Sequence, residues 1–195
     1  NSINIFRNHG PTAGASLNHP HSQIIGSMVS TPAINEQINY ARRATNTWGT
    51  CVYCDLIKFE ISEHERIIME TEHFVALSPF ASRSPFETRI FPKRHTSHFS
   101  EITEDEIQDL ASMLKSTLGK LYVCLDNPDY NYIIRSMTTK DGEVQYYHWY
   151  IVIIPKISKV AGFEIGSGIF INTAEPEMCA QALREACEPE VTCGE

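Results

Sequence analysis

Two segments of the sequence share one strand pattern, and this internal repeat restricts the possible folds more than any other feature. Ile3–Asn8 (INIFRN) aligns with Tyr130–Ser136 (YNYIIRS) when Asn4 is matched with Asn131. A second β-rich run follows each segment, and its histidine motif begins 15 residues after Asn4 (19 − 4) and 17 after Asn131 (148 − 131). Such a repeat means that one supersecondary unit is used twice. The alternative is a chance match, because short β-rich strings are common.

The first copy carries the motif HPHSQ over residues 19–23, directly after a loop of small residues. We expect a strand over residues 19–26, whose two-residue period would point His19, His21 and Gln23 to one face of the sheet. Two imidazoles and an amide on one face indicate a binding or catalytic surface. The alternative is a polar edge strand without chemistry.

The loop that precedes this motif offers space for an anionic ligand. Gly14, Ala15 and Ser16 carry little or no side chain, so a ligand can approach the backbone, and free N–H groups in such a turn can hold a phosphate. The arrangement predicts an attack on phosphorus by the neutral imidazole of His21. Ser16 and Gln23 would then donate neutral hydrogen bonds to phosphate oxygens.

The second copy has lost one of the two imidazoles. In the alignment His148 takes the position of His19, and Tyr150 replaces His21. We therefore expect only the first copy to carry the reactive imidazole.

A cysteine pair indicates a metal site in the second copy. The two-residue gap between Cys51 and Cys54 lets both thiolates reach one tetrahedral ion, and His95 and His148 are the best candidates for the remaining ligands. Four protein ligands leave no open position, so such a zinc site would be structural. The alternative is a free-thiol or redox pair. The other histidines considered as ligands, which we expect to be ordinary surface or core residues, are His98, His73, His64 and His9.

Periodicity and turn signals place the remaining elements. Thr103 and Glu106 form a predicted capping box at the start of a long amphipathic helix over residues 103–125. We expect further helices over 31–48 and 176–186, and strands over 3–8, 65–69, 73–77, 87–92, 130–135 and 146–154. Residues 140–143 would form a hairpin tip, residues 51–54 a metal knuckle, and the glycine-punctuated segment 162–168 a loop.

The charge balance limits the partners. A formal charge of −8 and a pI of about 5.5 leave no broad basic surface for a nucleic-acid polymer, and an anionic substrate would need local positive charge. No apolar run approaches the roughly 20 residues of a membrane span, so we expect a cytoplasmic protein with no membrane partner.

Taken together, the motif residues resemble a known active-site signature. The run Asn8-x-Gly10, Gly14-Ala15-Ser16 and HPHSQ is similar to that of galactose-1-phosphate uridylyltransferases, a branch of the histidine-triad superfamily. Residues 86–99, the long helix and residues 146–156 resemble a second, degenerate histidine-triad domain. The resemblance implies an α+β fold with a histidine-triad-like antiparallel sheet and packed helices.

The same resemblance implies a carboxy-terminal portion of a two-domain enzyme. Its expected parts are the end of a first domain with the active-site motif (1–30), a linker helix (31–50), a complete second domain with the zinc site (51–188) and a frayed tail (189–195). Family resemblance also implies a homodimer.

The resemblance assigns roles to individual residues. His21 would be the nucleophile that forms a covalent nucleotidyl–histidine, and His19 would bind the zinc ion of the first domain. The second-domain zinc, for which iron is the alternative, would be held by Cys51, Cys54, His95 and His148. The substrate-binding positions would be Asn8, Gly14, Ala15, Ser16, Gln23, Phe163, Glu164 and Gly168.

One departure leaves the substrate open. The galactose enzymes have Gly-Tyr-Glu where this chain has Gly166-Ser167-Gly168, and the FEIGSG form is closer to ADP-glucose phosphorylases. Nucleotidyl transfer between a nucleotide sugar and a sugar 1-phosphate is the expected reaction, with adenylyl transfer to phosphate as the alternative. Two rivals are a related hydrolase that uses water and a zinc-stabilised binding module without activity.

Overall fold

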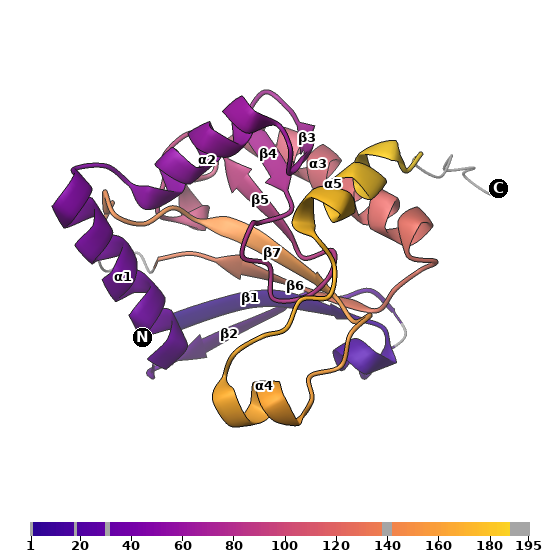
Figure 1. Ribbon diagram of the computed structural model, residues 1–195. Coiled ribbons are helices and arrows are strands. Elements are labelled where there is room, and N and C mark those ends of the chain that lie inside the picture. Colours follow the sequence, from indigo (N-terminus) through magenta and orange to yellow (C-terminus); the bar gives the residue numbers. More distant parts are fainter. Residues whose placement is uncertain (1, 18, 30–31, 138–141, 188–195) are drawn as a thin grey trace.

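The computed structural model describes residues 2–17, 19–29, 32–137 and 142–187 (Figure 1). In this part of the chain a seven-stranded antiparallel sheet has the order β2-β1-β6-β7-β5-β4-β3. Its strands are β1 (Ser2–His9), β2 (Gln23–Ser27), β3 (Ile67–Glu70), β4 (Phe74–Leu77), β5 (Thr88–Pro92), β6 (Tyr130–Arg135) and β7 (Tyr150–Pro155). The helices are α1 (Pro32–Trp48), α2 (Val52–Glu63), α3 (Glu104–Cys124), α4 (Gly162–Ser167) and α5 (Pro176–Glu185), with 3-10 turns η1 (Pro11–Ala13) and η2 (Phe99–Glu101). This is the α+β architecture that the sequence predicts.

Helices cover both faces of the sheet (Figure 1). On one face α3 and α5 bury apolar side chains against the strands, with Met113 and Leu183 fully buried. On the other face α1 and α2 pack through Ala41 and Ile57. Successive strand residues alternate between the two cores, as a two-residue period requires, so Ile151 faces α3 and Val152 faces α2. The sheet is therefore the common wall of two cores.

The two copies of the repeat lie side by side in the sheet, from its edge strand β2 to its middle strand β7. β1 pairs with β6, and each continues into its own hairpin partner, β2 or β7. In the strand register, Phe6 on β1 is paired with Ile133 on β6. Gln23 on β2 is paired with Phe6, and Val152 on β7 is paired with Ile133. β2 and β7 therefore take corresponding places in the two copies, and the numbers of their corresponding residues differ by 129 (152 − 23). The same shift places His148 at the position of His19 (148 − 19), as the sequence alignment predicts.

The long helix α3 begins where its capping box predicts. The side chain of Thr103 accepts a hydrogen bond from the amide of Glu106 at 3.3 Å, and the Glu106 carboxylate accepts one from the amide of Thr103 at 2.9 Å. The expected helices that correspond to α1 and α5, and the expected meander of β3, β4 and β5, are also present.

Four elements differ from the sequence predictions. β2 begins at Gln23 rather than at residue 19, because Pro20 has no N–H for the ladder. β7 begins at Tyr150 rather than at residue 146, because the amide of Trp149 donates to the carbonyl of Thr96 at 3.0 Å instead of joining the ladder. The knuckle at residues 51–54 is the start of helix α2, and the loop at 162–168 contains helix α4.

Some expectations fall outside the described residues. Residues 140 and 141 of the expected hairpin tip at 140–143 and the whole expected tail at 189–195 lie outside the described part of the chain. Within the described part of the chain, no helix is long and apolar enough to cross a bilayer.

Candidate active site and metal centre

The imidazole of His21 lies between the small-residue loop and β2, partly exposed. Its Nδ1 atom is 3.1 Å from the backbone carbonyl oxygen of His19. A carbonyl oxygen only accepts hydrogen bonds, so Nδ1 carries the proton of the neutral ring and Nε2 keeps its lone pair. The ring is therefore held in the tautomer that a nucleophilic Nε2 needs.

His19 and His21 still lie near each other, although both precede β2. The rings of His19 and His21 lie close together, with centroids 5.6 Å apart. Ser22, between His21 and the strand, places its Oγ 3.0 Å from the hydroxyl oxygen of Tyr132 on β6. The prediction of a strand at residues 19–22 is wrong, but the two imidazoles do lie together.

The loop before the motif is a closed turn rather than an open cradle. Gly10 and Gly14 have φ values of 82° and 83°, which favour glycine. The amides of Ala13 and Ala15 donate to the carbonyl of Gly10 at 3.2 and 3.1 Å, and the amide of Gly14 donates to the carbonyl of Pro11 at 3.0 Å. The N–H groups of residues 13–15 are thus used within the turn, which leaves a smaller set for phosphate than the sequence implied.

A cavity of about 180 Å³ lies between β1 and the loop, and its walls include Arg7, Asn8, Ala15 and His19. The Nε atom of Arg7 is buried and has no hydrogen-bond partner in the described part of the chain. Arg7 thus brings a positive charge to the wall of this cavity, which would favour an anionic ligand. Sequence analysis missed this residue; the signal was a cation inside a β-rich run next to the motif.

Other expected substrate contacts are less closely grouped. Ser16 lies exposed on the loop and Gln23 begins β2, and among the described residues neither forms a hydrogen bond with His21. Asn8, in contrast, is tied into the site, since its amide nitrogen lies 3.4 Å from the carbonyl oxygen of Gly14.

The tail segment lies on α4, apart from these cavity walls. Phe163 is 55% exposed, Gly168 is the αL residue that ends α4, and the carboxylate of Glu164 accepts a hydrogen bond from the amide of Ala161. Glu164 also lines a separate cavity of about 320 Å³ with Arg83, and no residue of the 8–23 segment lines that cavity. The role of the tail in binding sugar phosphate stays a prediction.

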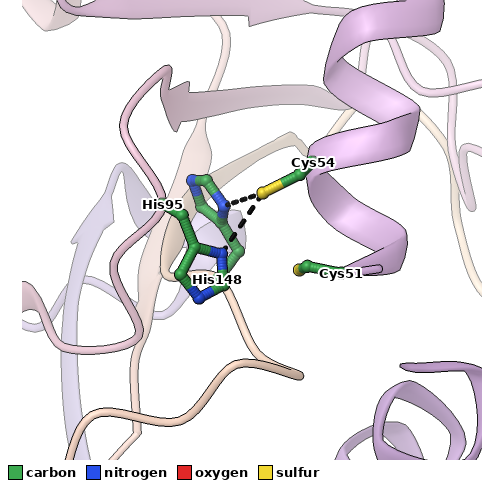
Figure 2. A group of neighbouring side chains, drawn as sticks. All are labelled: Cys51, Cys54, His95 and His148. Atoms are coloured by element: carbon green, nitrogen blue, oxygen red, sulfur yellow. Dashed lines mark hydrogen bonds between the residues drawn. The ribbon is translucent and has the colours of Figure 1, made fainter. Parts of the chain in front are cut away.

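A Cys₂His₂ cluster forms where α2 begins (Figure 2). Cys51 and Cys54 point toward His95 and His148, and the four possible ligand atoms lie within 4.8 Å of one another. The Sγ atom of Cys54 is 3.2 Å from Nδ1 of His95 and 3.5 Å from Nδ1 of His148. The first turn of α2 therefore brings both thiols to the same side, which a two-residue gap allows. The cluster could hold a metal ion.

Backbone carbonyls fix the orientation of both imidazoles in the cluster. Nε2 of His95 donates to the carbonyl of Val144 at 3.2 Å, and Nε2 of His148 donates to the carbonyl of Pro92 at 2.8 Å. Both Nδ1 lone pairs are thus left facing the thiols, and metal-binding histidines are oriented by such hydrogen bonds from the other ring nitrogen.

The two thiols behave as one unit. A hydrogen bond from the thiol of Cys54 lowers the pKa of Cys51, against the opposite effect of burial, and the same bond raises the pKa of Cys54. A divalent cation that binds the pair would displace thiol protons. Two thiols with two oriented imidazoles are a donor set that suits zinc.

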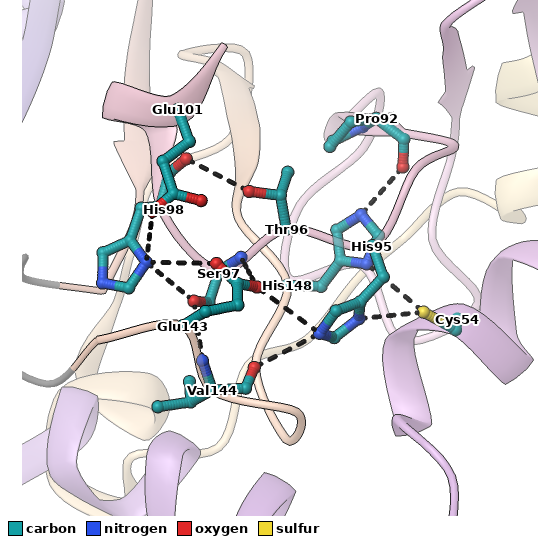
Figure 3. A network of polar contacts seen from close by, with 10 residues as sticks. All are labelled: Cys54, Pro92, His95, Thr96, Ser97, His98, Glu101, Glu143, Val144 and His148. Carbon is teal, nitrogen blue, oxygen red and sulfur yellow. Dashed lines mark hydrogen bonds and ion pairs between the residues drawn. The ribbon is translucent and has the colours of Figure 1, made fainter.

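A further polar network supports this cluster from outside (Figure 3). Ser97 donates its amide to the carboxylate of Glu143 at 3.0 Å and accepts the amide of Val144 at 3.2 Å. His98, which is buried, lies 2.8 Å from Ser97 Oγ and 3.5 Å from Glu143. The network holds the segment whose carbonyl orients His95. Ser97, Glu143 and Val144 carry no local sequence signal for this role.

The expected first-copy metal site is not assembled in the described residues. His19 occupies the position of His148 in the repeat, but it is exposed and belongs to no Cys–His cluster there. Its role as a ligand stays a prediction.

Comparisons with known proteins give this site a context. A family model described as "Domain of unknown function (DUF4921)" matches residues 1–189. The ADP-glucose phosphorylase of Arabidopsis thaliana is 37% identical over 187 residues, which are 95% of this chain and 52% of that protein. The galactose-1-phosphate uridylyltransferase of Thermotoga maritima is 33% identical over 192 residues, which are 94% of this chain and 59% of that protein. The chain thus spans about half to three-fifths of the length of these relatives.

Solved structures agree with the fold. The ADP-glucose phosphorylase of Arabidopsis thaliana with bound ADP-glucose superposes with a TM-score of 0.85 at 35% identity, over 95% of this chain and 59% of that one. A uridylyltransferase mutant gives a TM-score of 0.88 at 30% identity, over 95% and 62%. A zinc-bound histidine-triad protein from Mycobacterium smegmatis, at 17% identity, a TM-score of 0.50 and 70% and 91% coverage, shares the fold alone.

Proposed function

This chain belongs to the DUF4921 family and is a homologue of galactose-1-phosphate uridylyltransferases and an ADP-glucose phosphorylase, and on that premise we propose that it transfers a nucleotidyl group through His21. The observation that carries the proposal is the hydrogen bond between Nδ1 of His21 and the carbonyl of His19, which leaves Nε2 unprotonated. A neutral imidazole in this state needs no separate base.

The reaction proceeds as a double displacement. Nε2 of His21 attacks the α-phosphorus of a nucleotide sugar, a P–N bond forms, and the bond to the sugar 1-phosphate breaks. The Nδ1 proton stays on the ring, where the carbonyl of His19 accepts its hydrogen bond and stabilises the positive charge of the intermediate. A phosphate oxygen of the acceptor then attacks the same phosphorus, and His21 leaves as neutral imidazole. Ping-pong kinetics follow.

Positive charge and hydrogen-bond donors for the phosphates come from the cavity walls. Arg7 and Asn8 both line this cavity, the Nε atom of Arg7 is buried without a partner among the described residues, and Asn8 would offer an amide nitrogen to a phosphate. Ser16 on the loop and Gln23 at the end of the motif would complete the set. These residues contact the substrate in the proposal.

The Cys51, Cys54, His95 and His148 cluster would hold zinc in a structural role. With all four positions filled by protein, the ion would supply no open site for substrate. It would stabilise the fold by joining α2 to the segment after β5 and to the segment before β7. The zinc assignment is supported by the two thiols and the two oriented imidazoles, and no step of the proposed reaction depends on it.

The proposed reaction has two forms, which differ in the nucleotidyl group and in the phosphate compound that accepts it. The Thermotoga relative supports uridylyl transfer to a hexose 1-phosphate, while the Arabidopsis relative and the FEIGSG segment support adenylyl transfer to inorganic phosphate. Incubating the full-length protein with UDP-glucose or ADP-glucose, and with either acceptor, distinguishes them by product. A product that forms without any added phosphate acceptor would favour hydrolysis instead.

The covalent step is tested by trapping. Full-length protein incubated with nucleotide sugar labelled at the α-phosphate should retain label on His21, and His21→Ala should retain none. His73→Ala, on the far side of the sheet before β4, is the matched control and should label as the wild type does. Full turnover by His21→Ala would refute the proposal.

A further inference from the structure

The active-site loop of the first copy is held by the second copy. Asp129, directly before β6, accepts hydrogen bonds from the amide and hydroxyl of Thr12 at 2.6 and 2.5 Å. Asn131, on β6, donates to the carbonyl of Ala13 at 2.8 Å. The turn that precedes the reactive histidine is therefore fixed by side chains more than 110 residues away in sequence.

The contact between Asp129 and the turn leaves no spare space. A Cβ atom at Gly10 would lie 1.7 Å from Oδ1 of Asp129, so the carboxylate packs directly on the glycine backbone. Hydrogen bonds from Thr12 also lower the pKa of Asp129, so the carboxylate is ionised and acts purely as an acceptor for the turn.

Asn131 sets the orientation of a second amide. Its Nδ2 lies 2.8 Å from the carbonyl oxygen of Ala13, which only accepts, so Asn131 must present its NH₂ group there. The same nitrogen lies 2.8 Å from the side chain of Asn8, which must therefore present its oxygen. The NH₂ group of Asn8 is then turned to the side of Gly14 and the cavity beside β1.

This orientation gives Asn8 the polarity that an anion needs. One N–H of its NH₂ group reaches the carbonyl of Gly14 only at 3.4 Å, a long contact, and the second N–H is available to a ligand oxygen. If the amide were reversed, a carbonyl oxygen would face the phosphate and repel it. A single hydrogen bond from β6 thus decides whether Asn8 attracts or repels the substrate.

We propose that Asn131 and Asp129 are positioning residues, through which the degenerate second copy of the repeat orients Asn8 and the loop for phosphate binding by the first copy. The proposal rests on the proposed function at His21, and it explains why a copy without the reactive imidazole still contributes to the reaction. Neither residue touches the substrate; both act through groups that do.

Two substitutions at position 131 test this orientation. Asn131→Leu removes both hydrogen bonds and frees the amide of Asn8. Asn131→Asp replaces the NH₂ group by a carboxylate, which draws the NH₂ group of Asn8 toward β6 and turns its oxygen to the cavity. We expect the half-saturating nucleotide sugar concentration for His21 labelling to rise about tenfold in the first variant, the loss of one hydrogen bond to a charged group, and further in the second.

Asp109→Asn provides a matched control for stability. Asp109 accepts hydrogen bonds from the hydroxyl of Thr71 and the amide of His73, the same chemistry as Asp129 with Thr12, but at the far edge of the sheet. Asp129→Asn and Asp109→Asn should lower the thermal midpoint similarly, and only Asp129→Asn should slow His21 labelling at saturating nucleotide sugar.

A double-mutant cycle in the full-length protein identifies the route. If Asn131 acts through Asn8, adding Asn131→Leu to Asn8→Ala should raise the half-saturating concentration no further. Additive effects, or wild-type labelling by Asn131→Asp, would overturn the proposal while His21 still labels. Absence of label in the wild type would instead overturn the proposed function, so the two failures are distinguishable.

Discussion

Nε2 of His148 donates a hydrogen bond to the carbonyl oxygen of Pro92 at 2.8 Å, and the opposite ring nitrogen thereby faces the thiol of Cys54. His148 is fully buried, so its ring cannot turn to another partner. The same histidine occupies the position of His19 in the repeat. One imidazole position has thus been kept in both copies, while its neighbour became Tyr150 in the second.

Cys54→Ser should remove one zinc ion per chain and lower the thermal midpoint. The reason is that the Sγ atom of Cys54 lies 3.2 and 3.5 Å from the two Nδ1 atoms, and binding free energy of a structural metal adds to folding free energy. Metal content by mass spectrometry and thermal unfolding with and without a chelator measure both effects. Cys187→Ser, an exposed thiol outside the cluster, is the control. Equal metal content in both variants would contradict the assignment.

Ser97→Ala should weaken zinc binding without removing a ligand. Ser97→Ala keeps the amide hydrogen bond to Glu143 but removes the Oγ atom that accepts from the amide of Val144. Because the carbonyl of Val144 orients His95, this loss loosens the ring. Losses of about ten- to a hundredfold in metal affinity are typical for such outer partners. Competition with a chromophoric chelator gives the affinity. An unchanged affinity would mean that the segment keeps its position without this network.

Arg7→Gln should raise the KM for nucleotide sugar about tenfold, because a charge-assisted contact to phosphate contributes roughly 1.4 kcal/mol or more. Arg43, an exposed arginine on α1 that lies outside the Arg7 cavity, serves as the control in Arg43→Gln. Steady-state kinetics at several salt concentrations separate a local contact from general attraction. If both variants change KM equally, Arg7 has no special role.

Glu106→Gln should destabilise the protein at neutral pH and have little effect near pH 2. The hydrogen bond from Arg94 lowers the pKa of Glu106 to about 2, against an ordinary value of 4.5. A lowered carboxyl pKa contributes stability above the ordinary pKa, and this contribution disappears as the pH falls from about 4.5 toward 2. Since Arg94 is half exposed, screening reduces the effect to about 1 kcal/mol. Urea unfolding of both proteins between pH 7 and 2.5 measures the difference.

Gly10→Ala should cost more than about 1 kcal/mol, from the positive φ and from the clash with Asp129. Gly26→Ala is the matched control, because β2 leaves open space around its Cβ position and its φ is ordinary. Chemical denaturation gives both values. A stability loss no greater than that of the control would show that the turn adapts.

Local signals explain what the sequence predicted well. The capping box of Thr103 and Glu106 fixes the start of α3, and the spacing of Cys51 and Cys54 anticipates the cluster with His95 and His148. Both depend on residues within one turn of a helix or on a ligand chemistry with few alternatives. The correspondence of His148 with His19 also follows from the repeat.

Contacts between distant segments explain what the sequence did not predict. Helix α2 was missed because residues 51–54 match a metal knuckle, although Tyr53 and Ile57 already show helical spacing. No local pattern connects Asp129 with Thr12, since these residues meet only after β1 and β6 pair. The closed turn at residues 10–15 likewise depends on glycine φ values that composition alone does not reveal.

The packing of Asp129 on Gly10 has an evolutionary consequence. A side chain at position 10 would clash with the carboxylate of Asp129 and would require a shorter residue at position 129, so a change at Gly10 alone costs stability. We therefore expect Gly10 and Asp129 to be inherited together, and a change at one position to be accompanied by a change at the other.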